Sequence, residues 1–186
     1  GAMPALLPRE RNTVRFLWAR LRALVGTTND AGEWQELRAL GTAAQTEMRP
    51  ASVALLCAEA AWLRGDLEAA EQIITAALPH AIESGEPSQL GALLVWLPRC
   101  GAKLPPLQAS IALPYRLEIE GKWQKAADAW AELGCVYEQA LALLAGDEAA
   151  LRAALDRFES LCARSSADIT RRRLRKLGGI ALRRWQ

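Results

Sequence analysis

Few residues in this sequence favour strands, and none of the common catalytic or metal-binding motifs is present. Only two Phe and two Tyr occur among 186 residues, whereas Ala and Leu together account for 66. Because Ala and Leu favour helices, and β-branched and aromatic residues favour strands, the composition predicts an all-α fold. The chain has no CxxC, HExxH or GxSxG, so we expect no metal site, no cofactor and no catalytic residues.

Cysteine is scarce and widely spaced. The four Cys are Cys57, Cys100, Cys135 and Cys162, and no two of them are close together in the sequence. Cys57, Cys135 and Cys162 sit in apolar runs, so we expect them to be buried, reduced thiols, as in a cytosolic protein. No apolar run approaches the roughly 18 residues that span a membrane, and the N-terminus lacks the features of a signal peptide. A cytoplasmic location is therefore predicted.

Composition sets the two ends of the chain apart. Residues 1–3 are typical of the remnant of a cleaved tag. Residues 171–186 carry seven Lys or Arg and no acid. The whole chain has 23 Lys or Arg and 21 Asp or Glu, so the part before Arg171 has a net negative charge. We therefore expect a single helical domain over 4–178, followed at 179–186 by a basic tail or the start of a linker.

Apolar residues recur at helical spacing through most of the chain. The pattern and its Gly and Pro breaks predict helices over 9–25, 32–48, 51–64, 66–83, 87–98, 107–120, 122–133, 135–145, 147–162 and 166–177. The links are short and rich in Gly, which suits left-handed helix stops and antiparallel packing of neighbouring helices. The pair Gly178-Gly179 is predicted to end the last helix, and the irregular segment 99–106 is predicted to be a hinge.

The predicted hairpins repeat a theme of helix, Gly turn, and helix with Ala at close-packing positions. It appears in "AAWLRGDLEAAEQII", "RLEIEGKWQKAADAW" and "ALALLAGDEAALRAA". Repeated hairpins of this length predict a solenoid, in which each hairpin buries its face against the next. They resemble degenerate tetratricopeptide (TPR) repeats, with Ala58, Ala70 and Ala77 at the small-residue positions. The resemblance implies a right-handed superhelix of antiparallel helical hairpins.

A second resemblance covers residues 112–178 well and 51–98 loosely. The Pro-Tyr helix, the "GKW" turn, the "WAELGCVYE" link, "GDEAALRAALDRFESL" and the Arg-rich "RLRKLG" are similar to the helical segment of bacterial LuxR-type transcriptional regulators that also carry an ATPase domain. This implies a non-enzymatic sensor or protein-interaction module. It would bind a protein partner or small effector and relay its state to the ATPase and helix-turn-helix domains. The resemblance is also compatible with homo-oligomerisation.

The neighbouring domains of that family are not found in this sequence. No GxxxxGK[ST] phosphate-binding loop is present, and the chain stops soon after "RKLGG". Val136 stands where the family usually has Pro. We therefore expect either a middle domain separated from its neighbours or a shortened relative.

The TPR resemblance also predicts a binding groove. In TPR-like arrays the first helix of each hairpin lines the concave side that binds ligand. Transferred by aligning Gly65 with Gly121, those positions are Leu55, Glu59, Trp62, Ile111, Tyr115 and Glu118. Such a groove would suit a peptide or a small amphipathic ligand.

Most of the tryptophans are expected to pack rather than to bind. Trp18 and Trp96 lie in apolar runs and are predicted core residues. Trp123 follows Gly121 directly after the turn and is expected to cover the hairpin corner. Trp130 comes two helical turns later, on nearly the same helix face, and is expected to fill the gap to the next hairpin.

The basic C-terminal segment supports an alternative function. A stand-alone helical-repeat protein could bind nucleic acid by counterion release, using Arg171, Arg172, Arg173, Arg175 and Lys176. The competing interpretation is a solvated last helix with cations near its C-terminus. Direct contact with nucleic acid is the less favoured of the two, since only Trp185 could stack on a base. An enzyme ranks third; it would need a pocket around His80 or Glu118, and His80 is expected to be a surface or structural residue.

Overall fold

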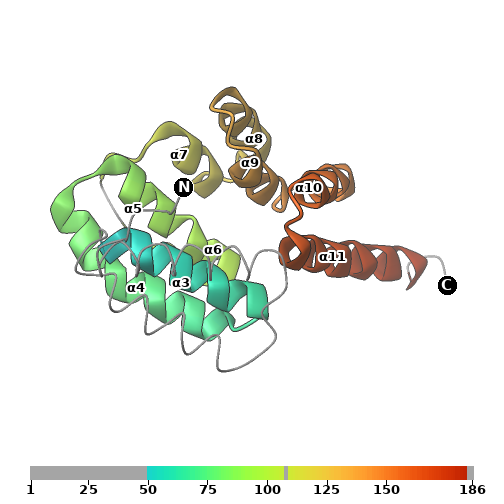
Figure 1. The fold of residues 1–186 in the computed structure, drawn as a ribbon, viewed down its shortest axis with the longest axis horizontal. Helices are drawn as coiled ribbons and strands as arrows, with labels where there is room; N and C mark the ends of the chain where they lie inside the picture. Colours follow the sequence, from blue (N-terminus) through green and yellow to red (C-terminus); the bar gives the residue numbers. More distant parts are fainter. Residues whose placement is uncertain (1–49, 107–108, 184–186) are drawn as a thin grey trace, which may run out of the picture. The chain divides into compact units, whose positions relative to one another are not determined.

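The computed structural model describes residues 50–106 and 109–183, and every regular element in them is a helix (Figure 1). The helices are α3 (Pro50–Arg64), α4 (Leu67–Ser84), α5 (Pro87–Leu94), α6 (Trp96–Cys100), α7 (Leu113–Ile119), α8 (Trp123–Glu132), α9 (Val136–Leu143), α10 (Glu148–Ser160) and α11 (Arg164–Arg183). The all-α prediction is confirmed for this part of the chain. The tag remnant, the predicted helices at 9–25 and 32–48, and Trp185 lie outside the described residues.

The chain forms two compact units, residues 1–109 and 110–186. The division falls just after the irregular segment 99–106, where the sequence predicts a hinge. The single domain over 4–178 stays a prediction.

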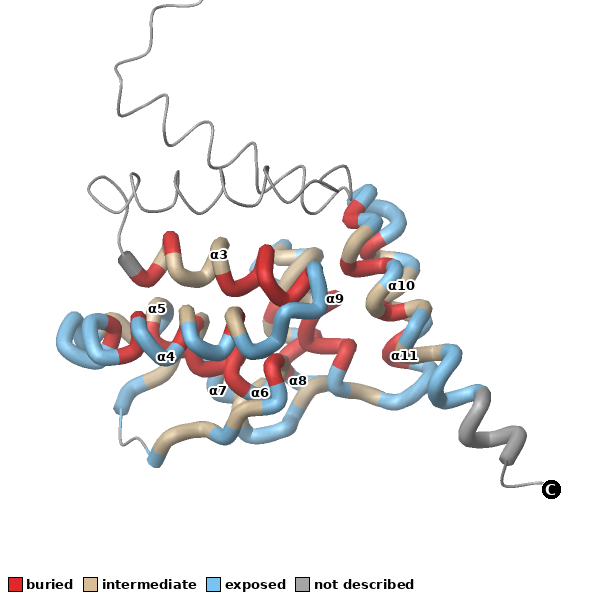
Figure 2. The backbone as a smooth tube through the Cα atoms, turned by 90° about the horizontal axis from the view of Figure 1, so that it is seen from below, coloured by how far each residue is buried: buried red, intermediate tan, exposed pale blue. Residues whose placement is uncertain are grey.

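The α3–α4 hairpin is the centre of the first unit. Gly65 ends α3 in the left-handed conformation, with φ +84°. The Asp66 side chain then accepts a hydrogen bond from the Ala69 backbone N–H at 3.2 Å and so caps α4. Ala58 on α3 and Ile74 on α4 are both 0% exposed, and the buried parts of the two contacting helices are drawn red in Figure 2. The Gly-Asp pair therefore ends one helix and starts the next, as its sequence predicts.

The second unit is a run of helices in which each contacts the next along the chain, from α7 to α11. Ala126, Ala140 and Ala154 are fully buried at these contacts, and a side chain of one methyl group lets the helices approach closely. Trp130 and Phe158 are 5% and 0% exposed and fill the remaining space. Trp130 is a core residue, as predicted, but its ring contact and its hydrogen bond are with α7 of its own hairpin, so the gap to the next hairpin stays a prediction.

Among the described residues, five helices end in the same hydrogen-bonded turn. After α8, the Gly134 N–H donates to the Ala131 carbonyl and the Cys135 N–H donates to the Trp130 carbonyl, both at 2.9 Å. This pair of bonds satisfies carbonyls that the helix end would leave unpaired. The turns of this type are centred on Gly65, Gly101, Gly121, Gly134 and Cys162. Cys162, with φ 56°, is the one non-glycine residue with positive φ in the part of the chain that the structure describes.

Two predicted helices are wrong in extent because of proline. The helix predicted over 87–98 stops at Leu94, and a short helix starts at Trp96. Pro98 explains the break, since its ring clashes with the carbonyl four residues earlier and it has no N–H to donate. The helix predicted over 107–120 begins only at Leu113, where Pro114 occupies the first turn, a position that suits its fixed φ.

The predicted stop at Gly178-Gly179 is also wrong, because α11 continues through both glycines to Arg183. A glycine in a helix interior costs about 1 kcal/mol relative to Ala, which lowers stability without forcing an end. Helix α11 therefore includes part of the segment predicted to be a tail.

The burial predicted for the cysteines is partly wrong. Cys162 is exposed, because it lies in a turn, and Cys57 and Cys135 are half-buried. Cys100 is the buried thiol, and all four cysteines are free. Burial raises the pKa of the Cys100 thiol to about 11, and the nearby Glu71 carboxylate adds to this shift.

Candidate functional site

The first-unit half of the predicted groove is largely closed. Glu59 and Trp62 are each 3% exposed, and only Leu55 is half-buried. The Trp62 ring packs edge-on against Trp96, with 5.6 Å between ring centroids. Trp62 is therefore a core residue, and truncating it would test packing before it tested binding.

The second-unit half of the predicted groove lies on and just before α7. Ile111, Tyr115 and Glu118 are all half-buried, and α7 has no buried residue. The structure places the two sets of three residues in different compact units, so the residues brought together locally are those of α7.

Tyr115 and Glu118 both contact Trp130 on α8. The Tyr115 and Trp130 rings are arranged edge to face, with 4.8 Å between their ring centroids. The Glu118 Oε1 atom accepts a hydrogen bond from the Trp130 indole N–H at 2.9 Å. A buried indole N–H needs such an acceptor, so Glu118 fixes the ring orientation. The pairing joins two different helices and carries no short-range sequence signal.

Trp123 covers a different corner from the one expected. A Cβ built on Gly146 would lie 3.0 Å from two atoms of the Trp123 ring. The ring therefore lies against the turn between α9 and α10. Gly146 is needed there because a Cβ would lie only 2.5 Å from the Ala150 Cβ as well as against the indole.

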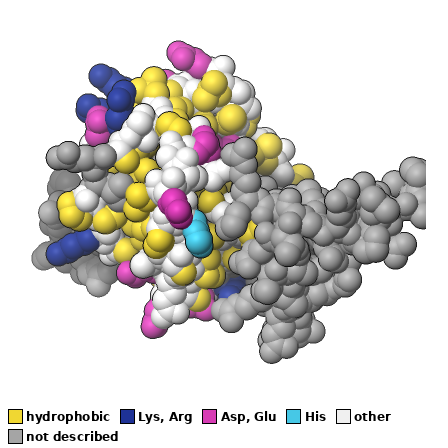
Figure 3. Space-filling model, turned by 90° about the vertical axis from the view of Figure 1, so that its left-hand side faces the viewer, with side chains coloured by type: hydrophobic (Ala, Val, Ile, Leu, Met, Phe, Trp, Pro, Cys, Tyr) yellow, Lys and Arg dark blue, Asp and Glu magenta, His cyan; other side chains and the backbone are white. Residues whose placement is uncertain are grey.

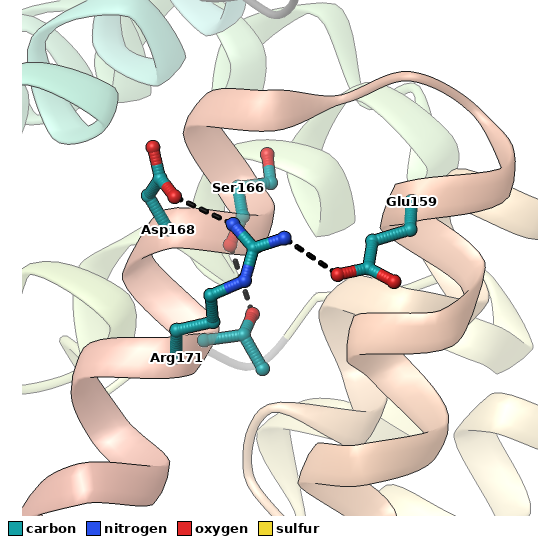
Figure 4. Close-up of polar contacts among 5 residues, drawn as sticks. Glu159, Ser166, Asp168 and Arg171 are labelled. Carbon is teal, nitrogen blue, oxygen red and sulfur yellow. Dashed lines mark hydrogen bonds and ion pairs between the residues drawn. The ribbon is translucent and has the colours of Figure 1, made fainter.

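The five basic residues of α11 that were predicted to contact nucleic acid divide into two groups. Arg171 donates to Glu159 Oε1 at 2.5 Å and to Asp168 Oδ1 at 2.6 Å (Figure 4). These hydrogen bonds raise the pKa of the Arg171 guanidinium. Arg173 donates to the Leu144 backbone carbonyl at 3.1 Å. Both side chains therefore tie α11 to the rest of the second unit.

The other group consists of Arg172, Arg175 and Lys176, which are exposed. Within the described residues, none of the three makes a hydrogen bond or ion pair. Their positions, one helical turn apart, put them on one side of the helix. Of the five residues predicted to contact nucleic acid, the structure thus leaves these three available.

A buried polar cluster, which the sequence did not reveal, holds α11 in place. Ser166 and Thr170 are 0% exposed. The Thr170 hydroxyl donates to the Ser166 carbonyl at 2.9 Å, and the Ser166 hydroxyl is 3.1 Å from the Tyr137 hydroxyl. Since buried hydroxyls are costly without partners, this cluster fixes how α11 lies against α9.

The remaining chemical candidates stay on the surface. The His80 imidazole, cyan in Figure 3, is 74% exposed and lies 4.0 Å from the Glu83 carboxylate. His80 is thus a surface residue, as expected.

Residues 50–106 and 109–183 hold no group of three His, Cys, Asp or Glu side chains that could bind a metal. In the same residues, no helix has both the length and the apolar character needed to cross a membrane.

Comparison of the chain with protein-family models, curated proteins and solved structures gives no match.

Proposed function

We propose that the chain is a TPR-like interaction module of a LuxR-type bacterial transcriptional regulator. It is not an enzyme. It binds a protein partner or small effector in the cytoplasm and passes the bound state to ATPase and DNA-binding domains. The resemblance over 112–178 suggests this role, and the repetition within the second unit is the observation that supports it.

The second unit contains an internal repeat, in which α10 and the turn after it correspond to α8 and the turn after it. Equivalent positions carry the same kind of side chain and make the same contacts, namely a fully buried Ala, a buried aromatic ring and a left-handed turn. The pairs are Ala126 and Ala154, Trp130 and Phe158, and Gly134 and Cys162. In both cases a tyrosine of the preceding helix packs edge-on against the aromatic ring, Tyr115 on Trp130 and Tyr137 on Phe158, although the two tyrosines do not occupy equivalent positions of the repeat.

The contacts between α9 and α11 support a solenoid. Tyr137 contacts Ser166, and Leu144 contacts Arg173. The two pairs have the same separation along the chain, so the two helices lie side by side and run in the same direction. This is the relation expected between the first helices of consecutive hairpins in a right-handed TPR-like superhelix.

The proposed binding face consists of Tyr115 and Glu118 on α7 and of Ile111 just before the helix. It combines a half-exposed apolar side chain, an aromatic edge and a carboxylate within a short stretch of chain. Trp130 fixes two of the three side chains, so little conformational entropy would be lost on binding. Such a face suits an extended peptide or a small amphipathic molecule.

The test uses short peptides selected from a phage-displayed random library on the intact chain. Selected peptides are then titrated by calorimetry against Ile111→Arg and, as the control, Leu113→Arg. Leu113 is 51% exposed and lies two positions, about 200° of helix rotation, from Tyr115. It therefore faces away from Trp130.

We expect Ile111→Arg to weaken peptide binding at least about tenfold, which corresponds to roughly 1.4 kcal/mol, and Leu113→Arg to leave it unchanged. The reverse order, or equal affinity for both variants, would contradict the proposed face. Unchanged helical circular dichroism of both variants is the check that they remain folded.

A further inference from the structure

The outer side of α11 carries a patch of positive charge that the fold does not use. We name Arg172, Arg175 and Lys176 the α11 basic patch. All three are exposed, whereas their neighbours Arg171 and Arg173 are engaged by Glu159, Asp168 and Leu144. The proposed sensor module has no need of this patch.

The charge is concentrated on this one helix. Helix α11 has seven basic residues and one acid, Asp168, which is paired with Arg171. The rest of the second unit, over positions 110–163, holds five basic and nine acidic side chains. A polyanion would therefore be attracted to α11 and repelled by the helices before it.

The patch consists of charged side chains, and its apolar neighbour on the same side is the half-buried Ile169, one turn before Arg172. Around the helix, Leu174 falls on the same side as the buried Ala167 and Thr170. This apolar side packs against α10, and the basic patch lies on the opposite side, beside Asp168. A helix that lies in a membrane surface buries apolar side chains next to its cations. In α11 the first part of the apolar side is occupied by the fold, at Ala167 and Thr170, and Leu177 near the end of the helix is 40% exposed.

The spacing of the patch suits a phosphate backbone. Side chains three or four positions apart on a helix have Cβ atoms about 5–6 Å apart. Duplex DNA presents one charge per about 1.7 Å along its axis, so adjacent cations can each reach a phosphate. The patch has neither a buried donor nor an aromatic side chain with which to identify a base.

From these observations we propose that the α11 basic patch binds the phosphate backbone of duplex DNA without sequence preference. The interaction is electrostatic and weak, with a dissociation constant of roughly 10⁻⁴ to 10⁻⁶ M at physiological salt. It is independent of the α7 face, so either proposal can fail while the other stands.

The expected salt dependence follows from three phosphate contacts. The logarithm of the binding constant should fall with the logarithm of salt concentration with a slope of about −2.7. Affinity would then drop ~40-fold between 50 and 200 mM salt. A slope close to zero would be incompatible with binding through released counterions.

The experiment measures fluorescence anisotropy of a labelled 20-base-pair duplex of random sequence, titrated with the full chain at 50, 100 and 200 mM salt. The variant is Arg172→Gln/Arg175→Gln/Lys176→Gln. The control is Arg116→Gln/Lys122→Gln/Lys125→Gln, which removes the same number of charges from exposed positions of α7, α8 and the turn between them. Thermal unfolding checks that both triple variants fold.

We expect the α11 triple variant to lose at least about tenfold in affinity at 50 mM salt and the control triple variant to lose much less. Equal losses in both variants would show a general effect of net charge and overturn the proposal. Absence of binding by the parent chain at 50 mM salt would also overturn it. So would tighter binding to vesicles of phosphatidylcholine and phosphatidylserine (3:1), or to oligoglutamate, than to the duplex.

Discussion

Replacing Cys162 by Gly should stabilise the second unit. Cys162 has φ 56°, at the position where the other four turns of the same type have glycine. A residue with a Cβ in this left-handed region costs about 1–2 kcal/mol relative to the right-handed one. The Cys162 side chain is exposed, so its loss removes little apolar contact. The turn therefore stores strain that a glycine would relieve.

The net effect is smaller than the strain because glycine also stabilises the unfolded chain. Its greater freedom there costs about 0.4–1 kcal/mol of folding free energy. Subtracting this leaves an expected gain of about 0–1.6 kcal/mol in the free energy of unfolding, with a midpoint of about 0.8 kcal/mol. The reverse substitution at the equivalent turn, Gly134→Ala, should destabilise by a similar amount. A Cβ at Gly134 meets no atom within 4 Å, so its cost comes from the backbone alone.

The assay is equilibrium urea unfolding followed by circular dichroism at 222 nm. Cys162→Ala is the control, because it removes the thiol and keeps a Cβ in the left-handed conformation; it should leave stability within about 0.5 kcal/mol of the parent. If Cys162→Gly and Cys162→Ala give the same gain, the thiol and not the backbone is responsible, and the reasoning fails. A loss of stability in Cys162→Gly would refute it directly.

Three further predictions concern single side chains of the two units. Gly146→Ala should destabilise by about 1–3 kcal/mol in thermal unfolding, since its Cβ would lie 2.5 Å from the Ala150 Cβ; no change would contradict the close approach. Glu118→Ala should cost about 1–3 kcal/mol because it leaves the buried Trp130 N–H unpaired, whereas Glu118→Gln should be much milder; equal losses would remove the role of the hydrogen bond. At pH 8 the Cys100 thiolate fraction should be about 90-fold below that of a thiol of pKa 9, since burial raises its pKa to about 11. Iodoacetamide labelling with peptide mass spectrometry should then modify Cys162 first and Cys100 last, and rapid labelling of Cys100 in the folded chain would contradict its burial.

Local signals in the sequence account for most of the fold. Gly followed by Asp or Lys marks the end of α3 and of α7 because only glycine enters the left-handed turn without strain. Apolar residues that recur every three or four positions predict the remaining helices. The errors have local causes too. Near Pro98 and Pro114, two helix boundaries differ from the predicted ones. Helix α11 does not end at Gly178, where the sequence predicted its end.

Interactions between distant residues could not be predicted in the same way. Trp62 is buried partly by its contact with Trp96, which lies on a different helix. No regular spacing in the sequence connects the two residues. The bonds of Arg171 and Arg173, which separate them from the α11 basic patch, depend on Glu159 and on a backbone carbonyl just after α9. A break after residue 162 was predicted, but the left-handed conformation of Cys162 was not, because its residue type gives no sign of it. The signal that could have found it is its correspondence with Gly134 in the internal repeat.

Amide hydrogen exchange, followed by mass spectrometry, tests the proposed interaction module most directly. The intact chain is compared free and bound to a peptide selected from the library. The account predicts slower exchange over residues 111–119 and the facing part of α8, with α10 unchanged. Slower exchange confined to other helices, with 111–119 unaffected, would contradict it.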